Sequence, residues 1–198
     1  MSFKSQTEQA KSFISPAVRA GGWVIDATIG NGNDTLFLAH LVGHSGKVFG
    51  FDIQESAINN TRKRIEQADT TDQVVLIHAG HEEMESQIPS TMKGLIQAVM
   101  FNLGYLPGSN KSCITQPNTT LTALKATESL LAPGGRITVL AYIGHEGGQA
   151  ENEMVNDWVN SLDQQRWRCN CIYPENATNP PRLYCCEKLS NLHDKTFS

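Results

Sequence analysis

A carboxamide and an aromatic ring lie close together at Asn102 and Tyr105, just past an apolar run that is typical of a central strand. This pair suits an amine nucleophile. The side-chain carbonyl of Asn102 and the backbone carbonyl of Leu103 can accept both N–H bonds and leave the lone pair directed at an electrophilic methyl group. Tyr105 can stack on a planar base. No deprotonated oxygen has to be generated, so positioning of the amine is the main source of catalysis. Positioning can lower an activation barrier by about 7–11 kcal/mol. A plain tight turn ending at Gly104 is the alternative.

A Gly-x-Gly turn follows the apolar run that starts at Trp23, and it leads into a helical pattern over 34–42. Gly30 and Gly32 lack a Cβ, so they can adopt φ > 0 and let a ligand approach the backbone. The helix that follows presents unpaired N–H groups and a partial positive charge. We therefore expect a nucleotide-like ligand over residues 30–34.

Acidic side chains around this turn indicate which ligand it binds. The second predicted strand ends at Asp52, and its distance from Gly30 (52 − 30 = 22 positions) is the spacing at which an acid meets ribose hydroxyls. A pyrophosphate binder of the NAD type requires a third glycine, and this chain has Thr35 there. Asp26 and Asp34 would repel a pyrophosphate but suit a ligand that carries an ammonium and a sulfonium. The charges favour S-adenosylmethionine (SAM), and a structural turn without a ligand is the alternative.

Four segments follow predicted strands and should meet at one edge of the sheet, where open parallel sheets bind their ligands. These segments are 26–34, 52–54, 80–82 and 102–107. In the third of them, His81 and Glu82 either meet the adenine of the cofactor or form a helix-capping pair in a turn.

Further polar residues lie on the ligand side of the predicted sheet. Lys111 either contacts a phosphate or is a solvated loop lysine. His145 and Glu146 lie in a glycine-rich turn, where they bind substrate or assist proton removal, since histidine titrates near neutrality. A simple helix start explains them nearly as well. The residues that we assign to substrate binding are Leu103, Gly104, Lys111, Tyr142, His145 and Glu146.

The remaining pattern supplies the elements that position these residues. The expected strands are 23–26, 47–52, 74–78, 95–101, 136–142, 166–173 and 182–189. The expected helices are 34–42, 54–68, about 117–131 and one ending near 163, with a turn at 132–135. The last two strands have no helix between them. This order predicts an α/β fold, a Rossmann-like, doubly wound, mostly parallel seven-stranded sheet with an antiparallel C-terminal hairpin.

The chain as a whole fits one domain over 1–198, with residues 1–22 as an amphipathic helical lead-in whose helix begins at Ser15 and Pro16. The charge run at 62–66 indicates a solvated helix face in preference to an RNA patch. A net charge of −4 argues against an extended RNA footprint but allows a small basic patch.

The five cysteines include no C-x-x-C pair, so no metal site is expected, and reduced thiols point to the cytoplasm. Neither a signal peptide nor a membrane span is expected.

Four segments together carry a family resemblance, namely 26–35, 50–54, 101–108 and 142–148. Over roughly 12–189 the chain resembles the class I SAM-dependent methyltransferases known as "putative rRNA methylases". Members of that family methylate the amine of 5-aminomethyl-2-thiouridine at the tRNA wobble position. For SAM, the resemblance implies contacts from Asp26, Gly30, Asn31, Asn33, Asp52, Gln54 and His81. Ile29 departs from the smaller or sulfur-containing residues of the family, which bears on packing more than on chemistry.

These inferences predict a SAM-dependent methyltransferase that acts on an exocyclic amine of RNA, with 5-aminomethyl-(2-thio)uridine at the tRNA wobble position favoured. Asn102 and Tyr105 are the predicted catalytic residues. An rRNA base amine, a small-molecule amine and a non-catalytic SAM or nucleotide sensor are the alternatives. The anticodon region of tRNA is the expected partner, whereas the sequence does not determine whether the protein forms a homodimer or where RNA docks.

Overall fold

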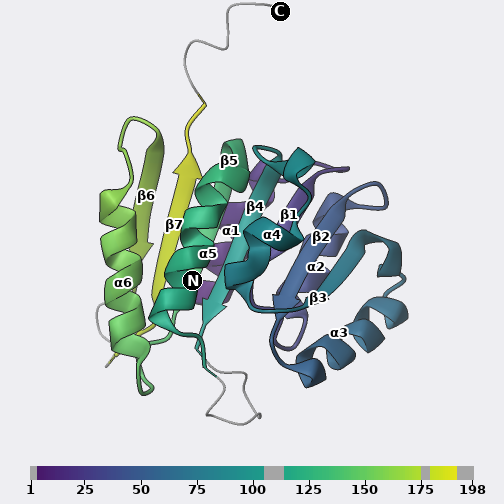
Figure 1. Ribbon diagram of the computed structural model, residues 1–198, viewed down its shortest axis with the longest axis horizontal. Coiled ribbons are helices and arrows are strands. Elements are labelled where there is room, and N and C mark those ends of the chain that lie inside the picture. Colours follow the sequence, from purple (N-terminus) through teal and green to yellow (C-terminus); the bar gives the residue numbers. More distant parts are fainter. Residues whose placement is uncertain (1–3, 105–113, 175–178, 191–198) are drawn as a thin grey trace, which may run out of the picture.

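The computed structural model describes residues 4–104, 114–174 and 179–190, which form a seven-stranded sheet with helices on both faces (Figure 1). The strands are β1 Trp23–Asp26, β2 Lys47–Asp52, β3 Val74–His78, β4 Ile96–Leu103, β5 Leu131–Ala141, β6 Trp167–Ile172 and β7 Arg182–Lys188. Their order is β3-β2-β1-β4-β5-β7-β6, in which β7 is antiparallel to both neighbours and the other pairs are parallel. The predicted doubly wound sheet with an antiparallel C-terminal hairpin is confirmed.

The helices divide over the two faces of the sheet. They are α1 Gln6–Ile14, α2 Asn33–Val42, α3 Glu55–Gln67, α4 Met84–Gln87, α5 Pro117–Leu130 and α6 Gly148–Ser161. Helices α1 and α2 pack into one core and α4, α5 and α6 into the other, while α3 packs along β2 and β3. None of the helices in the described ranges is long and apolar enough to cross a membrane.

Both faces of the sheet are buried, which explains the continuous apolar runs in the sequence. Val24 and Ile25 of β1 are fully buried, each in a different core, and Val48 and Phe49 of β2 repeat the pattern. Burial of a side chain of this size contributes about 1.5–3 kcal/mol. The central strands therefore give a rigid base to the residues at their carboxyl ends.

The N-terminal helix differs from the prediction. Its N-cap is Ser5, whose Oγ accepts a hydrogen bond from Glu8 N at 3.3 Å while Ser5 N donates to Glu8 Oε2 at 2.7 Å. This reciprocal pair is a capping box, which satisfies two backbone donors at the start of the helix. The predicted start at Ser15 is wrong, because Ser15 Oγ donates to Lys11 O at 2.7 Å and so closes α1. Only a short 3-10 turn follows.

Strand β4 ends later than predicted. Its last residues, Asn102 and Leu103, pair with Leu140 and Ala141 of β5. Asn102 was predicted to lie just past the strand, but it belongs to the strand itself. Because its backbone is paired with β5, the Cα of Asn102 has a fixed position, from which the side chain extends.

Strand β5 begins earlier than predicted, at Leu131, and the expected turn at 132–135 is part of it. The register with β4 shifts between Ile96 and Ala98, so the extra residues of β5 form a bulge. Gly134 supplies the positive φ of 79° that the bulge requires. The turn signal in the sequence therefore marks a bulge within β5. Beyond the bulge, β5 continues and pairs with Asn102.

Candidate active site

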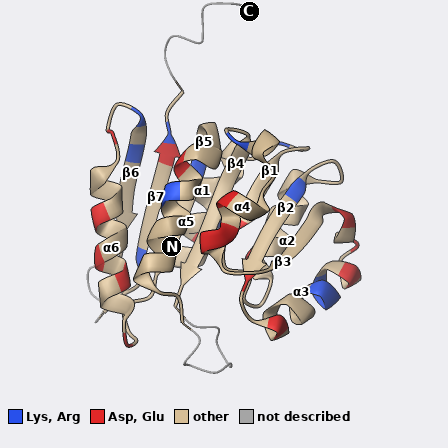
Figure 2. Ribbon diagram, viewed as in Figure 1, with Lys and Arg blue, Asp and Glu red and all other residues tan. Residues whose placement is uncertain are grey.

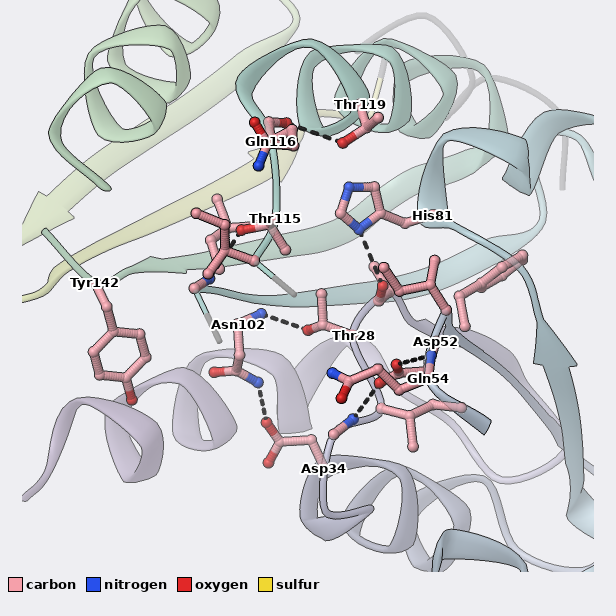
Figure 3. A pocket seen from close by; sticks show the side chains of 18 of the residues that line it. Thr28, Asp34, Asp52, Gln54, His81, Asn102, Thr115, Gln116, Thr119 and Tyr142 are labelled. Carbon is pink, nitrogen blue, oxygen red and sulfur yellow. Dashed lines mark hydrogen bonds between the residues drawn. The ribbon is translucent and has the colours of Figure 1, made fainter. Parts of the chain in front are cut away.

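The carboxyl ends of β1, β2 and β4 meet at a cavity of about 850 Å³ (Figure 3). The strand order reverses between β1 and β4, and open α/β sheets bind their ligands at such a switch point. The volume lies within the range of small-molecule sites, about 300–1,000 Å³. The predicted site residues that line the cavity are Gly30, Asn31, Asn33, Asp34, Asp52, Gln54, His81, Glu82, Asn102, Leu103, Gly104, Tyr142 and His145.

Asp52 connects the end of β2 to the glycine turn. Its Oδ2 accepts a hydrogen bond from Gly30 N and its Oδ1 accepts one from Gln54 N, both at 2.8 Å. Gly30 has a φ of +52°, which glycine adopts without the steric cost of a Cβ. Each carboxylate oxygen has a second lone pair. Asp52 can therefore hold the turn and still accept from the hydroxyls of a ligand.

Gly32 supports the turn from behind the cavity. It has a φ of +74°, and a Cβ at this position would lie 2.5 Å from Thr61 Oγ1 of α3. Gly32 is not among the lining residues, so its position does not support the predicted direct contact with the cofactor. Instead, Gly32 lets the start of α2 approach α3 closely.

Arg64 on α3 fixes the two asparagines of the turn. Its Nη1 donates to Asn31 O at 2.8 Å and to Asn33 Oδ1 at 2.5 Å. The charge run that contains Arg64 had indicated a solvated face, so Arg64 is not among the predicted site residues. Only the approach of α3 to the turn distinguishes Arg64 from Arg62 and Lys63, and no sequence signal carries that information.

Asp26 is fully buried behind the cavity wall. Its Oδ2 accepts from Thr35 Oγ1 at 2.6 Å and its Oδ1 accepts from Thr28 N at 3.2 Å. Burial, followed by the charge of Asp34, raises the pKa of Asp26 to about 7. Asp26 does not line the cavity, so its position does not support the predicted direct contact with the cofactor. It ties the glycine turn to α2.

The raised pKa of Asp26 predicts a pH-dependent stability. Between the ordinary pKa of 3.8 and about 7, the native state binds more protons than the unfolded chain, so the free energy of unfolding falls as pH rises. Asp26→Asn removes this titration. The stability of the variant relative to wild type should rise by up to about 1.4 kcal/mol per pH unit across the window and then level off. Urea unfolding of both proteins at several pH values measures this, and a constant difference would contradict a buried, proton-binding Asp26.

His81 begins a short helical turn, η3 (His81–Glu83), and is buried at the wall of the cavity. Its Nδ1 lies 3.3 Å from Ala27 O, and since a carbonyl only accepts, Nδ1 carries the proton. Its ring meets Phe101 edge-on, with 5.8 Å between the ring centroids. Burial lowers the pKa of His81, which keeps the ring neutral. A neutral imidazole beside Glu82 suits a flat, uncharged base, so the adenine contact stays a prediction.

Asn102 is held at its backbone and at its side chain. Its N–H donates to Thr28 Oγ1 at 2.7 Å, and its Nδ2 donates to Asp34 Oδ2 at 2.6 Å. The carbonyl oxygen of the amide points to the side of Tyr142 (Figure 3). The other oxygen of Asp34 pairs with Lys11 Nζ at 2.9 Å. Asp34 was predicted to contact the cofactor, and Lys11 is not among the predicted site residues.

A buried acid that the sequence analysis missed supports the segment after β4. Glu151, which is 2% exposed, accepts from Thr115 Oγ1 and from Thr120 Oγ1, both at 2.7 Å. Thr115 Oγ1 also accepts from Gly104 N at 2.9 Å, and Thr115 N donates to Gly104 O at 3.0 Å. An acid in the first turn of a helix is ordinary in a sequence. Its partners lie 36 and 31 residues away, so the pattern could not identify it.

Tyr142 lies on the opposite side of the cavity from Asp52 (Figure 3). Burial and the charge of Asp34 raise the pKa of Tyr142, so its hydroxyl stays protonated at neutral pH. The Tyr142 N–H donates to Leu103 O at 3.4 Å, a long hydrogen bond. The second lone pair of this carbonyl is available to another donor.

His145 lines the cavity, whereas Glu146 does not. The Nδ1 of His145 lies 2.9 Å from Glu146 O, so Glu146 contributes a backbone carbonyl that orients the ring. The predicted contact between the Glu146 side chain and substrate is not supported by its position. Tyr105 and Lys111, which the sequence analysis assigned to catalysis and to substrate binding, lie outside the described residues.

The reversed β7 and the carboxylates around the glycine turn place the chain among class I SAM-dependent methyltransferases and separate it from NAD-type dinucleotide binders. Within that class it belongs to the family described as "Putative rRNA methylase", which residues 48–188 match. The family that the sequence motifs indicated is therefore confirmed.

Known proteins that are similar to most of this chain include the following three. The tRNA (mnm5s2U34)-methyltransferase, chloroplastic, of Arabidopsis thaliana is 42% identical over 196 residues, which are 95% of this chain and 71% of that protein. The crystal structure of a "putative rRNA-methylase" from Clostridium thermocellum is 44% identical with a TM-score of 0.89, covering 96% of this chain and 100% of that chain. A "putative methyltransferase" from Streptococcus mutans, solved in complex with SAH, is 40% identical with a TM-score of 0.85, covering 95% and 100%. SAH is demethylated SAM, so the predicted cofactor is confirmed.

Proposed function

We propose that this protein transfers a methyl group from SAM to the amine of 5-aminomethyl-(2-thio)uridine at the wobble position of tRNA. The name of the Arabidopsis relative, a tRNA (mnm5s2U34)-methyltransferase, supports the substrate. The fixed orientation of Asn102 supports the chemistry, and this observation carries the proposal.

Asn102 suits an amine because its side chain offers the cavity an acceptor. With Nδ2 donating to Asp34, Asn102 Oδ1 can accept one N–H of the amine and Leu103 O can accept the other. The lone pair is then directed away from both oxygens. SAM supplies a methyl group on a sulfonium, so the nitrogen gains a C–N bond as the C–S bond breaks, SAH is the leaving group, and the alkylated nitrogen releases one proton to water.

The remaining part of the cavity fits SAM. The residues that we assign to it are Gly30, Asn31, Asn33, Asp52, Gln54, His81 and Glu82. Asp52 would accept from the ribose hydroxyls, and His81 with Glu82 would meet the adenine. Among the described lining residues, Asp34, Asp52 and Glu82 are acids and Lys11 is the basic residue, a balance that suits a cationic donor.

The acceptor nucleoside would enter from the side of Tyr142. The lining residues there come from α1, from the end of β5 and from the segment before β7, and they are Thr7, Lys11, Tyr142, Ile143, Asn179 and Pro181. Tyr142 is 42% exposed as a residue, and base stacking on an aromatic ring contributes about 1–3 kcal/mol. Figure 2 shows acidic residues along α6 and on α4, which would repel phosphates. We therefore place the RNA at the end of the sheet that holds the cavity.

Nucleoside mass spectrometry of tRNA tests the substrate. Cells that lack the gene should accumulate the unmethylated aminomethyl nucleoside and lose the methylaminomethyl form. Re-expression of the wild-type chain should restore it, while Asn102→Ala at equal expression should not. Unchanged tRNA together with a missing methyl group in rRNA would redirect the activity to an rRNA base, and unchanged RNA of both kinds would favour a small-molecule amine.

The pH dependence of the rate distinguishes an aliphatic amine from a base amine. An alkylamine has a pKa near that of lysine, about 10.4, so only its small deprotonated fraction can attack at neutral pH. With an aminomethyl anticodon stem-loop, the single-turnover rate should rise about tenfold per pH unit below the pKa of the amine. SAM affinity measured at the same pH values serves as the control. A flat rate over a range in which SAM binding is constant would contradict an alkylamine acceptor.

A further inference from the structure

The carboxylate of Asp34 lies between two side chains from distant parts of the chain. One oxygen is 2.6 Å from Asn102 Nδ2 at the end of β4, and the other is 2.9 Å from Lys11 Nζ on α1. We propose that Asp34 is a positioning residue that orients the Asn102 carboxamide, and that Lys11 holds Asp34 in place. This inference rests on the proposed function of Asn102 as the amine acceptor group.

The contact with Asp34 permits a single orientation of the amide. An ionised carboxylate only accepts hydrogen bonds, so the NH₂ group of Asn102 must face it. A flipped amide would bring Asn102 Oδ1 to 2.6 Å from Asp34 Oδ2 with no proton between the two oxygens. The flipped state would also offer N–H groups to the incoming amine, which needs acceptors. Asp34 therefore selects the orientation that amine chemistry requires.

Lys11 in turn fixes Asp34 from the N-terminal helix. Its Nζ pairs with Asp34 Oδ1 and lies 5.1 Å from the ring centroid of Phe37, one turn further along α2. The side chains of Lys11 and Asp34 are only 29% and 10% exposed, so solvent screens the pair less than at an open surface. Ala10 and Ile14 anchor α1 in the core on either side of Lys11. Helix α1 is therefore part of the acceptor half of the site.

This arrangement changes the assignment of Asp34. Its charge had suggested a contact with the cofactor, but one oxygen accepts from the Asn102 amide and the other pairs with the cationic Lys11, which offsets the attraction for a cationic donor. If Asp34 acts on Asn102, its replacement should lower kcat and leave SAM affinity nearly unchanged. If it binds the cationic donor, SAM affinity should fall.

Asp34→Asn tests this difference with little change in size. An asparagine can donate or accept, so it lets the Asn102 amide adopt both orientations. We expect kcat on the aminomethyl stem-loop to fall roughly tenfold or more, because misplacement of a reacting group has a cost of this order. The SAM dissociation constant, measured by calorimetry, should change less than about twofold. Lys11→Met should lower kcat less than Asp34→Asn does, and Lys11→Arg, which keeps the charge, should retain the kcat of wild type. Lys93→Met, which breaks an exposed ion pair with Glu85, is the matched control.

A spectroscopic measurement keeps the test independent of the substrate. In wild type the side-chain NH₂ signals of Asn102 should show slow exchange with water, and Asp34→Asn should accelerate it. A tenfold or larger rise in the SAM dissociation constant with unchanged kcat would show instead that Asp34 binds the donor. Tighter acceptor binding in Lys11→Met would show that Lys11 occupies the place of the acceptor amine. Wild type that fails to methylate the stem-loop would reject the proposed function, and Asn102 exchange would still decide the role of Asp34.

Discussion

Asn102→Ala should lower kcat by roughly 100-fold or more while the SAM dissociation constant changes less than about twofold. The substitution removes the Oδ1 acceptor that we assign to the amine and leaves the glycine turn and Asp52 intact. The backbone N–H of residue 102 still donates to Thr28, so the strand keeps its place. The loss should therefore appear in the chemical step and not in cofactor binding.

Single-turnover methylation of the aminomethyl stem-loop, with SAM calorimetry on the same preparation, measures this split. Asn170→Ala is the matched control, because Asn170 is an exposed asparagine within β6, away from the cavity. Its rate should equal that of wild type. A normal rate for Asn102→Ala would reject the role of Asn102 in holding the amine, whichever RNA is the acceptor.

The sequence predicted the sheet because each strand carries its own signal. Val24 and Ile25 enter opposite cores, so the burial of both faces appears as an apolar run without alternation. The hairpin of β6 and β7 was also predicted from a local feature, because the segment between the two strands is too short for the helix that a parallel pair would need. The turn at 132–135 was misjudged because Gly134 serves a bulge and a turn equally well.

The contacts between side chains of distant elements could not be predicted in this way. Asp34 reaches Asn102 across 68 positions, and Lys11 comes from a helix whose start was misplaced. Charge grouped Asp26 and Asp34 at the cofactor, and the spacing of 22 positions from Gly30 added Asp52. In the structure Asp26 is buried behind the wall, Asp34 faces Asn102, and Asp52 holds the turn. The residue types predicted that these acids gather at one edge of the sheet. Only the geometry shows that each of the three has different partners there.

The largest expected effect on cofactor binding is at Asp52. Asp52→Ala removes the carboxylate that we assign to the ribose hydroxyls, and it leaves Gly30 N and Gln54 N without their acceptor. A hydrogen bond to a charged group contributes about 1.5–3 kcal/mol. The SAM dissociation constant should therefore rise roughly 10- to 100-fold.

A comparison of SAM with SAH separates a ribose contact from attraction to the sulfonium. The two molecules share the ribose, and only SAM carries the sulfonium charge. A ribose contact therefore predicts that Asp52→Ala weakens both by the same factor, whereas charge attraction predicts a larger loss for SAM. Asp157→Ala, at an exposed position on α6, removes the same charge far from the cavity and should leave both affinities unchanged. Calorimetric titrations that show an equal loss for both ligands would support the ribose assignment, and a loss confined to SAM would reject it.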